Sequence, residues 1–400
     1  MVMLTSLQPV EVHGASLLRS RPVVGILSQP HNEESDYIAA SYVKWLESAG
    51  ARSIVIPYEA DDNLLHEIFT QINGVLFPGG DAPLPPTAKS MWKMIIEKNL
   101  HEDDFFPVWG TCLGFEFLVM LAAGAKEDDG TLQHGFDAEN VTLPLIFPSE
   151  DDVIQSNGVY STESQLYAES SQLREDLVKY NITMNNHHMG ITPSQFQRIS
   201  NLTDMFHITS TNLDRKGRPF VSTIESKRYP IFGVQFHPEK NNFEYGLMDA
   251  LKPLAKYYSD EPYEVINHSQ KGVELSMKLA LFFVGQVRRS TNGRYNMTHK
   301  HPTVYEYPMV RGRGFEQKFI IPKAAHWQSK ENNENGSIHD VENLFMGVAF
   351  LFIMSSIIVL RSYRFGIKLI QKSYSDIPDS VAVELLSEHS FDDEQDGNRI

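Results

Sequence analysis

The chain contains a single cysteine, Cys112, which lies where an apolar run meets a helical pattern. Glycines flank it two residues away on each side, in the segment Gly110-Thr111-Cys112-Leu113-Gly114. A cysteine between two glycines at a strand-to-helix turn is the arrangement of a nucleophile elbow, which lifts the side chain off the sheet. A lone thiol forms no internal disulfide, so Cys112 is either buried and inert or kept for covalent chemistry.

A cysteine nucleophile needs a base and a group that orients this base. The best candidate for the base is His237, which ends an apolar strand, and Glu239 follows on the same side of an extended chain. His237 would accept the thiol proton and donate it to the leaving amine, while Glu239 holds its tautomer. We expect the helix that starts at Leu113 to favour the thiolate. Its free N–H groups, together with that of Gly80, would form an oxyanion hole.

Each of these features has a structural alternative when it is taken alone. Residues 237–239 could end a strand in a turn, and residues 78–80 could form an ordinary turn. The segment 185–188, two asparagines followed by two histidines, could be a solvated loop or half of a metal site. We expect no metal, because no second cysteine and no nearby carboxylate stand at ligand spacing. Catalysis is favoured because three features fall at strand ends of one α/β pattern.

The elements that must position these residues alternate regularly in the first third of the chain. Apolar runs predict buried strands at 23–28, 53–57, 74–77 and 105–109, and helical periodicity predicts helices at 37–49, 63–70, 91–99 and 113–123. This alternation predicts a doubly wound α/β fold, with a mostly parallel sheet flanked by helices. Such folds carry their sites at the carboxyl ends of the strands, where Gly79, Gly80 and Cys112 fall.

The pattern changes after Gly124. Shorter strands are predicted at 141–147, 207–210, 220–225 and 231–236, and amphipathic helices at 243–256 and 273–288. From residue 291 the sequence is polar, with a terminal strand predicted at 315–321. We therefore expect one catalytic domain over residues 21–322.

Five stretches of the chain together resemble the γ-glutamyl hydrolase (folylpolyglutamate hydrolase) family, from the class I glutamine amidotransferase-like superfamily. They are residues 21–27, 37–52, 75–80, 107–116 and 234–240. The resemblance implies a cysteine peptidase that cleaves γ-linked glutamate from folylpoly-γ-glutamates and antifolate polyglutamates, usually in lysosomes or after secretion. It also implies no metal, no organic cofactor and commonly a homodimer.

The resemblance implies roles for individual residues. The nucleophile, the catalytic histidine, the third member and the two oxyanion-hole N–H groups match, in that order, Cys112, His237, Glu239, Gly80 and Leu113. A histidine that lines the family's cleft matches His187, with His188 as the neighbouring alternative. Other pocket positions match Tyr37, Arg52, Glu116 and Lys240. Arg52 and Lys240 would clamp substrate carboxylates, and the alternative is ordinary surface charge.

A membrane segment is predicted near the C-terminus, at residues 344–360, which carry no charge and are mostly apolar. A helix of this length is at the short end of those that span a bilayer core of about 30 Å. Arg361, Arg364 and Lys368 follow it, so the positive-inside rule puts the tail, 361–400, in the cytoplasm and the body in a lumen or outside. The alternative is a buried core helix. Residues 323–343 would be a polar stalk.

The sequons agree with a luminal body, because all six N-x-S/T sites precede the membrane segment: Asn140, Asn181, Asn201, Asn267, Asn296 and Asn335. Residues 1–20 lack a convincing apolar signal core and are either the remnant of a signal sequence or an atypical start. The tail motif Tyr374-Ser375-Asp376-Ile377 has the pattern that sorting adaptors bind. We expect a lysosomal, endosomal or cell-surface membrane protein, with secretion as the alternative.

The net charge of −16 argues against a nucleic-acid partner. Two other functions stay open beside a γ-glutamyl peptidase. The motifs also suit the glutaminase half of a synthetase, although no ammonia-accepting domain follows in these 400 residues. A catalytically silent membrane receptor on the same fold is the third function, and the presence of Cys112, His237 and Glu239 counts against it.

Overall fold

A computed structural model describes residues 21–101, 104–124, 129–168, 171–246, 262–292, 303–312 and 315–323. The chain divides into two units, Met1–His326 and Trp327–Ile400, and all of the described residues belong to the first. The predicted stalk, membrane segment and tail, and residues 1–20, therefore lie outside the described residues. Among the helices that the structure describes, none is both long and apolar enough to cross a bilayer.

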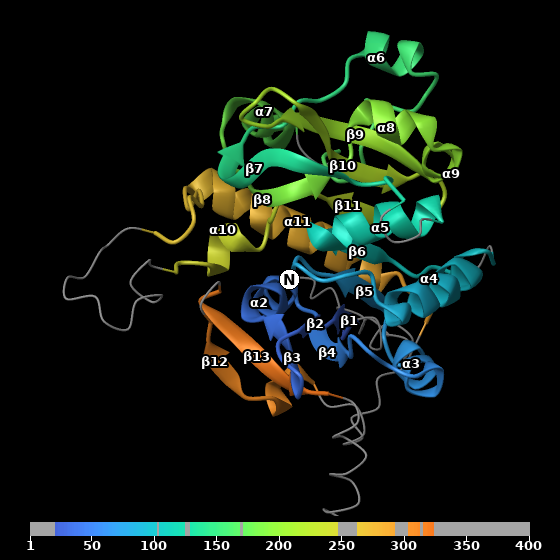
Figure 1. Ribbon diagram of the computed structural model, residues 1–400, viewed down its shortest axis with the longest axis vertical. Helices are drawn as coiled ribbons and strands as arrows, with labels where there is room; N and C mark the ends of the chain where they lie inside the picture. The colour runs from blue at the N-terminus through green and yellow to red at the C-terminus, as the bar shows by residue number, and fades with distance from the viewer. Residues whose placement is uncertain are drawn as a thin grey trace, which may run out of the picture. The chain divides into compact units, whose positions relative to one another are not determined.

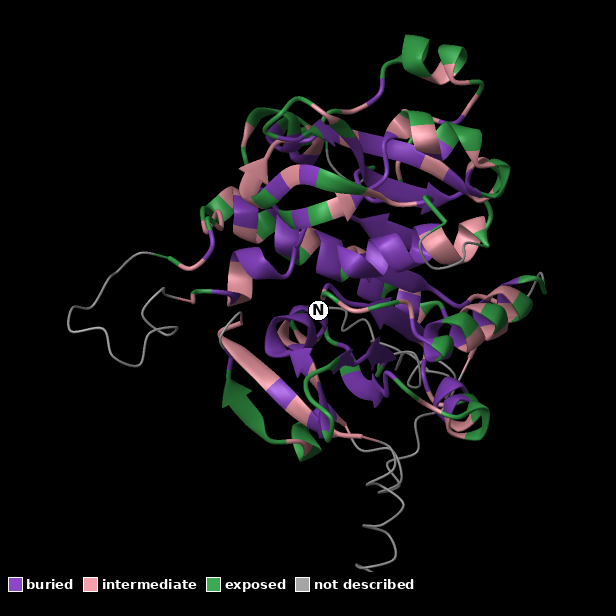
Figure 2. Ribbon diagram, viewed as in Figure 1, coloured by how far each residue is buried: buried purple, intermediate pink, exposed green. Residues whose placement is uncertain are grey.

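The main sheet of the described part has seven strands (Figure 1). Their order is β4 (Arg52–Ile56), β1 (Val23–Leu27), β5 (Gly74–Phe77), β6 (Val108–Thr111), β11 (Ile231–Val234), β10 (Pro219–Ser226) and β9 (Phe206–Leu213). The first five run parallel. β10 is antiparallel to its neighbours β11 and β9, so β9 runs in the same direction as the first five. The central strands are buried along their whole length, as the continuous apolar runs predict (Figure 2). The predicted mostly parallel sheet is confirmed.

Helices cover both faces of this sheet. Val108 of β6 joins a buried cluster to which α3 (Asp62–Phe69), α4 (Pro86–Asn99) and α5 (Leu113–Ala123) contribute. The next residue, Trp109, points to the opposite face, because successive side chains of a strand alternate. There its ring lies 5.2 Å from Trp45 of α2 (Ala40–Ser48) and 5.6 Å from Phe283 of α11 (Gln270–Arg288). The sheet is therefore doubly wound.

Two smaller sheets flank the main one. The first is antiparallel, in the order β12 (Met309–Arg311), β13 (Gln317–Pro322), β3 (Ser35–Ala39) and β2 (Gln29–Pro30). The second pairs β7 (Gln133–Leu143) with β8 (Thr183–Gly190). The short remaining helices are α6 (Glu150–Gln155), α7 (Ser171–Lys179), α8 (Pro193–Arg198), α9 (Ser200–Met205), α10 (Lys240–Phe243) and the 3₁₀ turn η2 (Val304–Glu306).

Several predicted boundaries were wrong, and one of them has a clear tertiary cause. Residues 37–39, predicted to be helical, end β3 because this strand pairs with β13 and β2. The segment 185–188 lies in β8 and is not a loop. Helix α4 begins five residues earlier than predicted, since Pro86 is accommodated in its first turn. The helix predicted at 243–256 is not present at Glu244, where the backbone is extended, and residues 247–256 lie outside the described residues.

Candidate active site

The backbone turns sharply at Cys112, between β6 and α5. Cys112 has φ 51° and ψ −108°, a backbone conformation that residues other than glycine rarely adopt. The flanking glycines allow this turn. A Cβ at Gly114 would lie 1.9 Å from the carbonyl oxygen of Phe77, and one at Gly110 would lie 2.5 Å from the carbonyl oxygen of Gly114. The spacing therefore has a steric reason, and the predicted elbow is present.

The environment of the thiol differs from the prediction. Burial raises the pKa of Cys112, and the carboxyl of Glu116 adds to this shift, whereas the Lys240 ammonium and the N–H of Leu113 oppose it. The expected thiolate at the helix N-terminus was wrong, because a helix dipole contributes only about 0.3–1 kcal/mol and the cost of burying a charge exceeds it. The resting thiol is neutral, and its sulfur lies 3.9 Å from the carbonyl oxygen of Asn186.

His237 and Glu239 lie beside Cys112 because β11 is the parallel neighbour of β6, with Val234 paired to Thr111. Both strands therefore deliver their following residues to the same edge of the sheet. His237 Nδ1 lies 2.7 Å from Glu239 Oε1, and both side chains are buried. A proton on Nδ1 satisfies the carboxylate, so Nε2 is left as the acceptor. This geometry is that of a histidine oriented by an acid.

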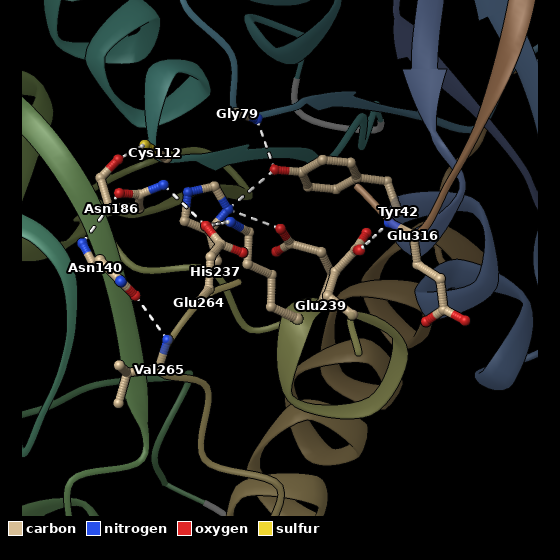
Figure 3. A network of polar contacts seen from close by, with 12 residues as sticks. Tyr42, Gly79, Cys112, Asn140, Asn186, His237, Glu239, Glu264, Val265 and Glu316 are labelled. Carbon is tan, nitrogen blue, oxygen red and sulfur yellow. Dashed lines mark hydrogen bonds and ion pairs between the residues drawn. The ribbon is translucent and has the colours of Figure 1, made fainter. Parts of the chain in front are cut away.

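Tyr42 of α2 joins this pair to the turn after β5, and the sequence analysis did not single it out. Its hydroxyl accepts a 2.8 Å hydrogen bond from the N–H of Gly79 and lies 3.3 Å from His237 Nδ1 (Figure 3). Burial raises the pKa of Tyr42 well above its usual value, and the neighbouring carboxyl of Glu239 adds to this shift. A tyrosine on a largely buried helix is typical of a core position, so the sequence holds no signal that would distinguish it.

The turn at Gly79 and Gly80 lies against the other site residues. A Cβ at Gly79 would be 2.6 Å from His237 Cε1 and 3.4 Å from Cys112 Cβ. Gly80, predicted to supply an oxyanion-hole N–H, follows directly, and Leu113 is the first residue of α5. Helix N-terminal N–H groups have no partner within their helix, so Leu113 can donate to a bound oxyanion. The predicted elements of an oxyanion hole are thus brought to one edge of the sheet.

Lys240, a predicted pocket residue, is fully engaged within the protein. Its ammonium lies 2.5 Å from Glu264 Oε1, and the side chains of both residues are buried. The same oxygen accepts a 2.9 Å hydrogen bond from Asn186 Nδ2. Figure 3 shows how Asn186 continues the network, through the N–H of Asn140 and from Asn140 Oδ1 to the N–H of Val265. The network links the lysine after the His–Glu pair to the carbonyl that contacts the thiol.

Glu116, another predicted pocket residue, lies in the first turn of α5 and is 3% exposed. Gln235 Nε2 donates a 3.0 Å hydrogen bond to its Oε1. Burial raises the pKa of Glu116 to about 8, so the carboxyl is protonated at neutral and acidic pH. A protonated carboxyl can donate a hydrogen bond to a carboxylate of a ligand. Its charge acts on the Cys112 thiol only above about pH 8.

His187, rather than its neighbour, points into the protein. It is buried and packs edge-on against Phe220, with 4.8 Å between ring centroids, whereas His188 is exposed and lies 3.4 Å from Glu139. Nδ1 of His187 donates to the carbonyl of Met189 at 2.7 Å. Burial lowers its pKa to about 4, so the ring is neutral. Within the described part of the chain its Nε2 has no partner, which leaves an acceptor.

Two predicted pocket residues differ in where they lie. Tyr37 in β3 packs against Phe315. Burial raises the pKa of Tyr37, and the charge of Asp81 adds to this shift. Tyr37 therefore lies near Asp81, the residue that follows the glycine turn. Arg52 was wrongly placed. It pairs with Val23 at the amino ends of β4 and β1. Cys112 follows the carboxyl end of β6, so the length of a strand lies between Arg52 and the site.

The sequons fall into three groups. Asn181 and Asn201 are exposed, although Nδ2 of Asn201 donates to the carbonyl of Ala123 at 3.1 Å. Asn140 and Asn267 are partly buried and hydrogen-bonded: Asn140 Oδ1 accepts from the N–H of Val265, and Asn267 Nδ2 donates to the carbonyl of Asn181. Asn296 and Asn335 lie outside the described residues.

Comparisons with known proteins agree with this geometry. The family model "Glutamine amidotransferase class-I" matches residues 35–247. "Gamma-glutamyl hydrolase B" of Dictyostelium discoideum is 35% identical over 292 residues, which cover 70% of this chain and 75% of that protein. The "Gamma-glutamyl hydrolase" proteins of Bos taurus and Homo sapiens are 34% and 31% identical, and the matches cover 75% and 79% of this chain and 90% and 94% of theirs. The chain therefore belongs to the γ-glutamyl hydrolase family of enzymes, built on a class I glutamine amidotransferase domain.

Proposed function

We propose that this enzyme hydrolyses γ-glutamyl peptide bonds through a thioester on Cys112, and that its substrates are folylpoly-γ-glutamates. The observation that carries the proposal is the strained turn at Cys112 beside the His237–Glu239 pair. The names of the relatives support the bond type. The protonated carboxyl of Glu116 near the thiol suits a substrate that is rich in carboxylates.

The chemistry follows from the tautomer of His237. Nε2 takes the thiol proton as Sγ attacks the γ-carbonyl carbon, so the high pKa of the resting thiol is overcome within the transfer itself. The N–H groups of Gly80 and Leu113 stabilise the oxyanion of the tetrahedral intermediate. Collapse breaks the C–N bond, and His237 gives its proton to the leaving amine. Nε2 of His237 then deprotonates a water, and this water attacks the carbonyl carbon of the thioester. The C–S bond breaks, and His237 returns the proton to the sulfur of Cys112.

The proposal is tested with the purified protein and a pteroylpolyglutamate at acidic pH, with chain shortening followed by mass spectrometry. Wild type should shorten the chain, and Cys112→Ala should not. Equal turnover by the two would exclude the cysteine mechanism. Ammonia release from glutamine without γ-peptide cleavage would favour the glutaminase alternative, and binding without turnover of either substrate would favour the silent receptor.

We also propose that residues 344–360 anchor the enzyme, with the catalytic domain luminal or outside and a lysosomal or endosomal address set by Tyr374. The uncharged run, the basic residues after it and the sequons before it support this topology. Carbonate extraction of membranes should leave the protein in the pellet, and a glycosidase should increase its mobility. Release into the supernatant would contradict anchoring, and an unchanged distribution of Tyr374→Ala would contradict the sorting role.

A further inference from the structure

Gln29 in β2 is a buried amide whose oxygen is unused. The residue is 2% exposed, and Oε1 has no hydrogen-bond partner among the described residues. The assignment of the amide is fixed by the other atom, because Nε2 donates to the carbonyl oxygen of Ser28 at 3.3 Å. An unpaired buried acceptor is unfavourable for the fold, so one that faces a site is a candidate contact for a bound substrate.

The unused oxygen lies against the turn that was assigned to the oxyanion hole. A Cβ at Gly80 would be 2.3 Å from Gln29 Oε1 and 2.9 Å from its Cδ. The preceding Gly79 lies in the same way against His237 and Cys112. Gln29 therefore covers one side of the glycine turn, while the catalytic pair lies on the other. Pairing of Gln29 with Tyr37 in β3 holds this position.

The chemistry of the atom determines what it can bind. An amide oxygen accepts a hydrogen bond and repels a carboxylate, so the ligand must supply an N–H or O–H donor. In a γ-glutamyl substrate the carbonyl oxygen occupies the oxyanion hole, and the α-carbon of the same unit carries one carboxylate and one N–H. Within the γ-glutamyl unit itself, this N–H is the only hydrogen-bond donor.

We propose that Gln29 Oε1 accepts the α-N–H of the γ-glutamyl unit under attack and so distinguishes it from acyl groups without this donor. The assignment rests on the proposed γ-glutamyl hydrolysis. The burial of Gln29 does not separate it from the site, because Cys112 and His237 are each 5% exposed in the same state.

The test compares two substrates of the full-length enzyme that differ at one group. One is an N-acyl-γ-glutamyl amide, whose α-nitrogen is a neutral amide N–H as in a polyglutamate, and the other is the corresponding glutaryl amide with a carboxylate but no α-nitrogen. Wild type should favour the γ-glutamyl amide by about 10- to 100-fold in kcat/KM, because the analogue leaves Gln29 unpaired. In Gln29→Met this preference should fall towards unity, whereas Gln29→Glu keeps an oxygen and should retain most of it.

A matched control removes another unpaired amide oxygen far from the site. Gln71 precedes β5 at the amino edge of the sheet, and its Oε1 is also buried and unpaired in the described structure. Gln71→Met should keep the wild-type preference. Equal loss on both substrates in Gln29→Met, or no preference in the wild type, would overturn the role of Gln29. If Gln29→Met does not fold, a wild type without preference still overturns the proposal, and loss of the preference in Gln29→Glu would also count against it. Absence of any γ-glutamyl cleavage by the wild type would instead refute the proposed function.

Discussion

Replacing Glu116 by glutamine should remove one pH dependence from the stability of the fold. The carboxyl is buried, and its pKa is raised from 4.5 to about 8. The folded state therefore holds a proton that the unfolded chain has released at neutral pH. Stability from this group is fully present below pH 4.5 and is lost as the pH rises towards 8. Glutamine has the shape of the protonated acid and does not titrate.

The magnitude follows from linkage. One proton contributes about 1.4 kcal/mol per pH unit between the two pKa values. From about pH 5.5 to about pH 7.5, the free energy of unfolding of the wild type should fall relative to Glu116→Gln by about 2–3 kcal/mol. His187 acts in the opposite direction, since burial lowers its pKa to about 4. It is present in both proteins, so its effect cancels in the difference.

Urea denaturation followed by tryptophan fluorescence measures this difference, because Trp45 and Trp109 are both buried in the core. Both proteins are unfolded at each pH, and the two free energies are subtracted. A difference that stays constant within about 0.5 kcal/mol over two pH units would refute the reasoning. It would mean that Glu116 is ionised in the fold and that the acid cannot act as a hydrogen-bond donor.

Three further outcomes test the elbow and the buried ion pair. Gly114→Ala should lower the free energy of unfolding by at least about 2 kcal/mol, because the added Cβ meets the backbone of the neighbouring strand. Gly285→Ala is the control: open space surrounds this helical glycine, so the substitution should raise the free energy of unfolding by about 1 kcal/mol. Chemical denaturation of both variants measures these changes. Cys112→Gly should be more stable than Cys112→Ala by about 1 kcal/mol, since only glycine relieves the positive φ, and equal melting temperatures would argue against strain. Lys240→Met and Glu264→Leu should each lower the free energy of unfolding by about 3–5 kcal/mol, because each leaves one buried charge unpaired, and the double variant should recover most of this loss. Additive losses in a double-mutant cycle would show that the two charges do not interact.

The sequence predicted the features that depend on neighbours in the chain. Helix α5 begins and ends where the pattern predicts, and Gly110 and Gly114 flank Cys112 because the turn between strand and helix leaves no room for a Cβ. The apolar runs predicted a parallel sheet, and parallel strands bring their carboxyl ends to one edge. This local logic was sufficient to predict that His237 and Glu239 lie beside the cysteine.

The tertiary structure decided what depends on groups distant in the chain. Tyr42 became a site residue only because α2 packs next to the turn at Gly79, and Lys240 found its counter-ion 24 residues away. Arg52 lies at the amino end of β4, the edge opposite the site; its pocket role came from the resemblance, whereas the predicted strand at 53–57 already placed it before the strand. Burial raises the pKa of the Cys112 thiol, and this burial depends on how many groups exclude water from it. A sequence lists the charges, but only the packed fold determines their distance from one another and from solvent.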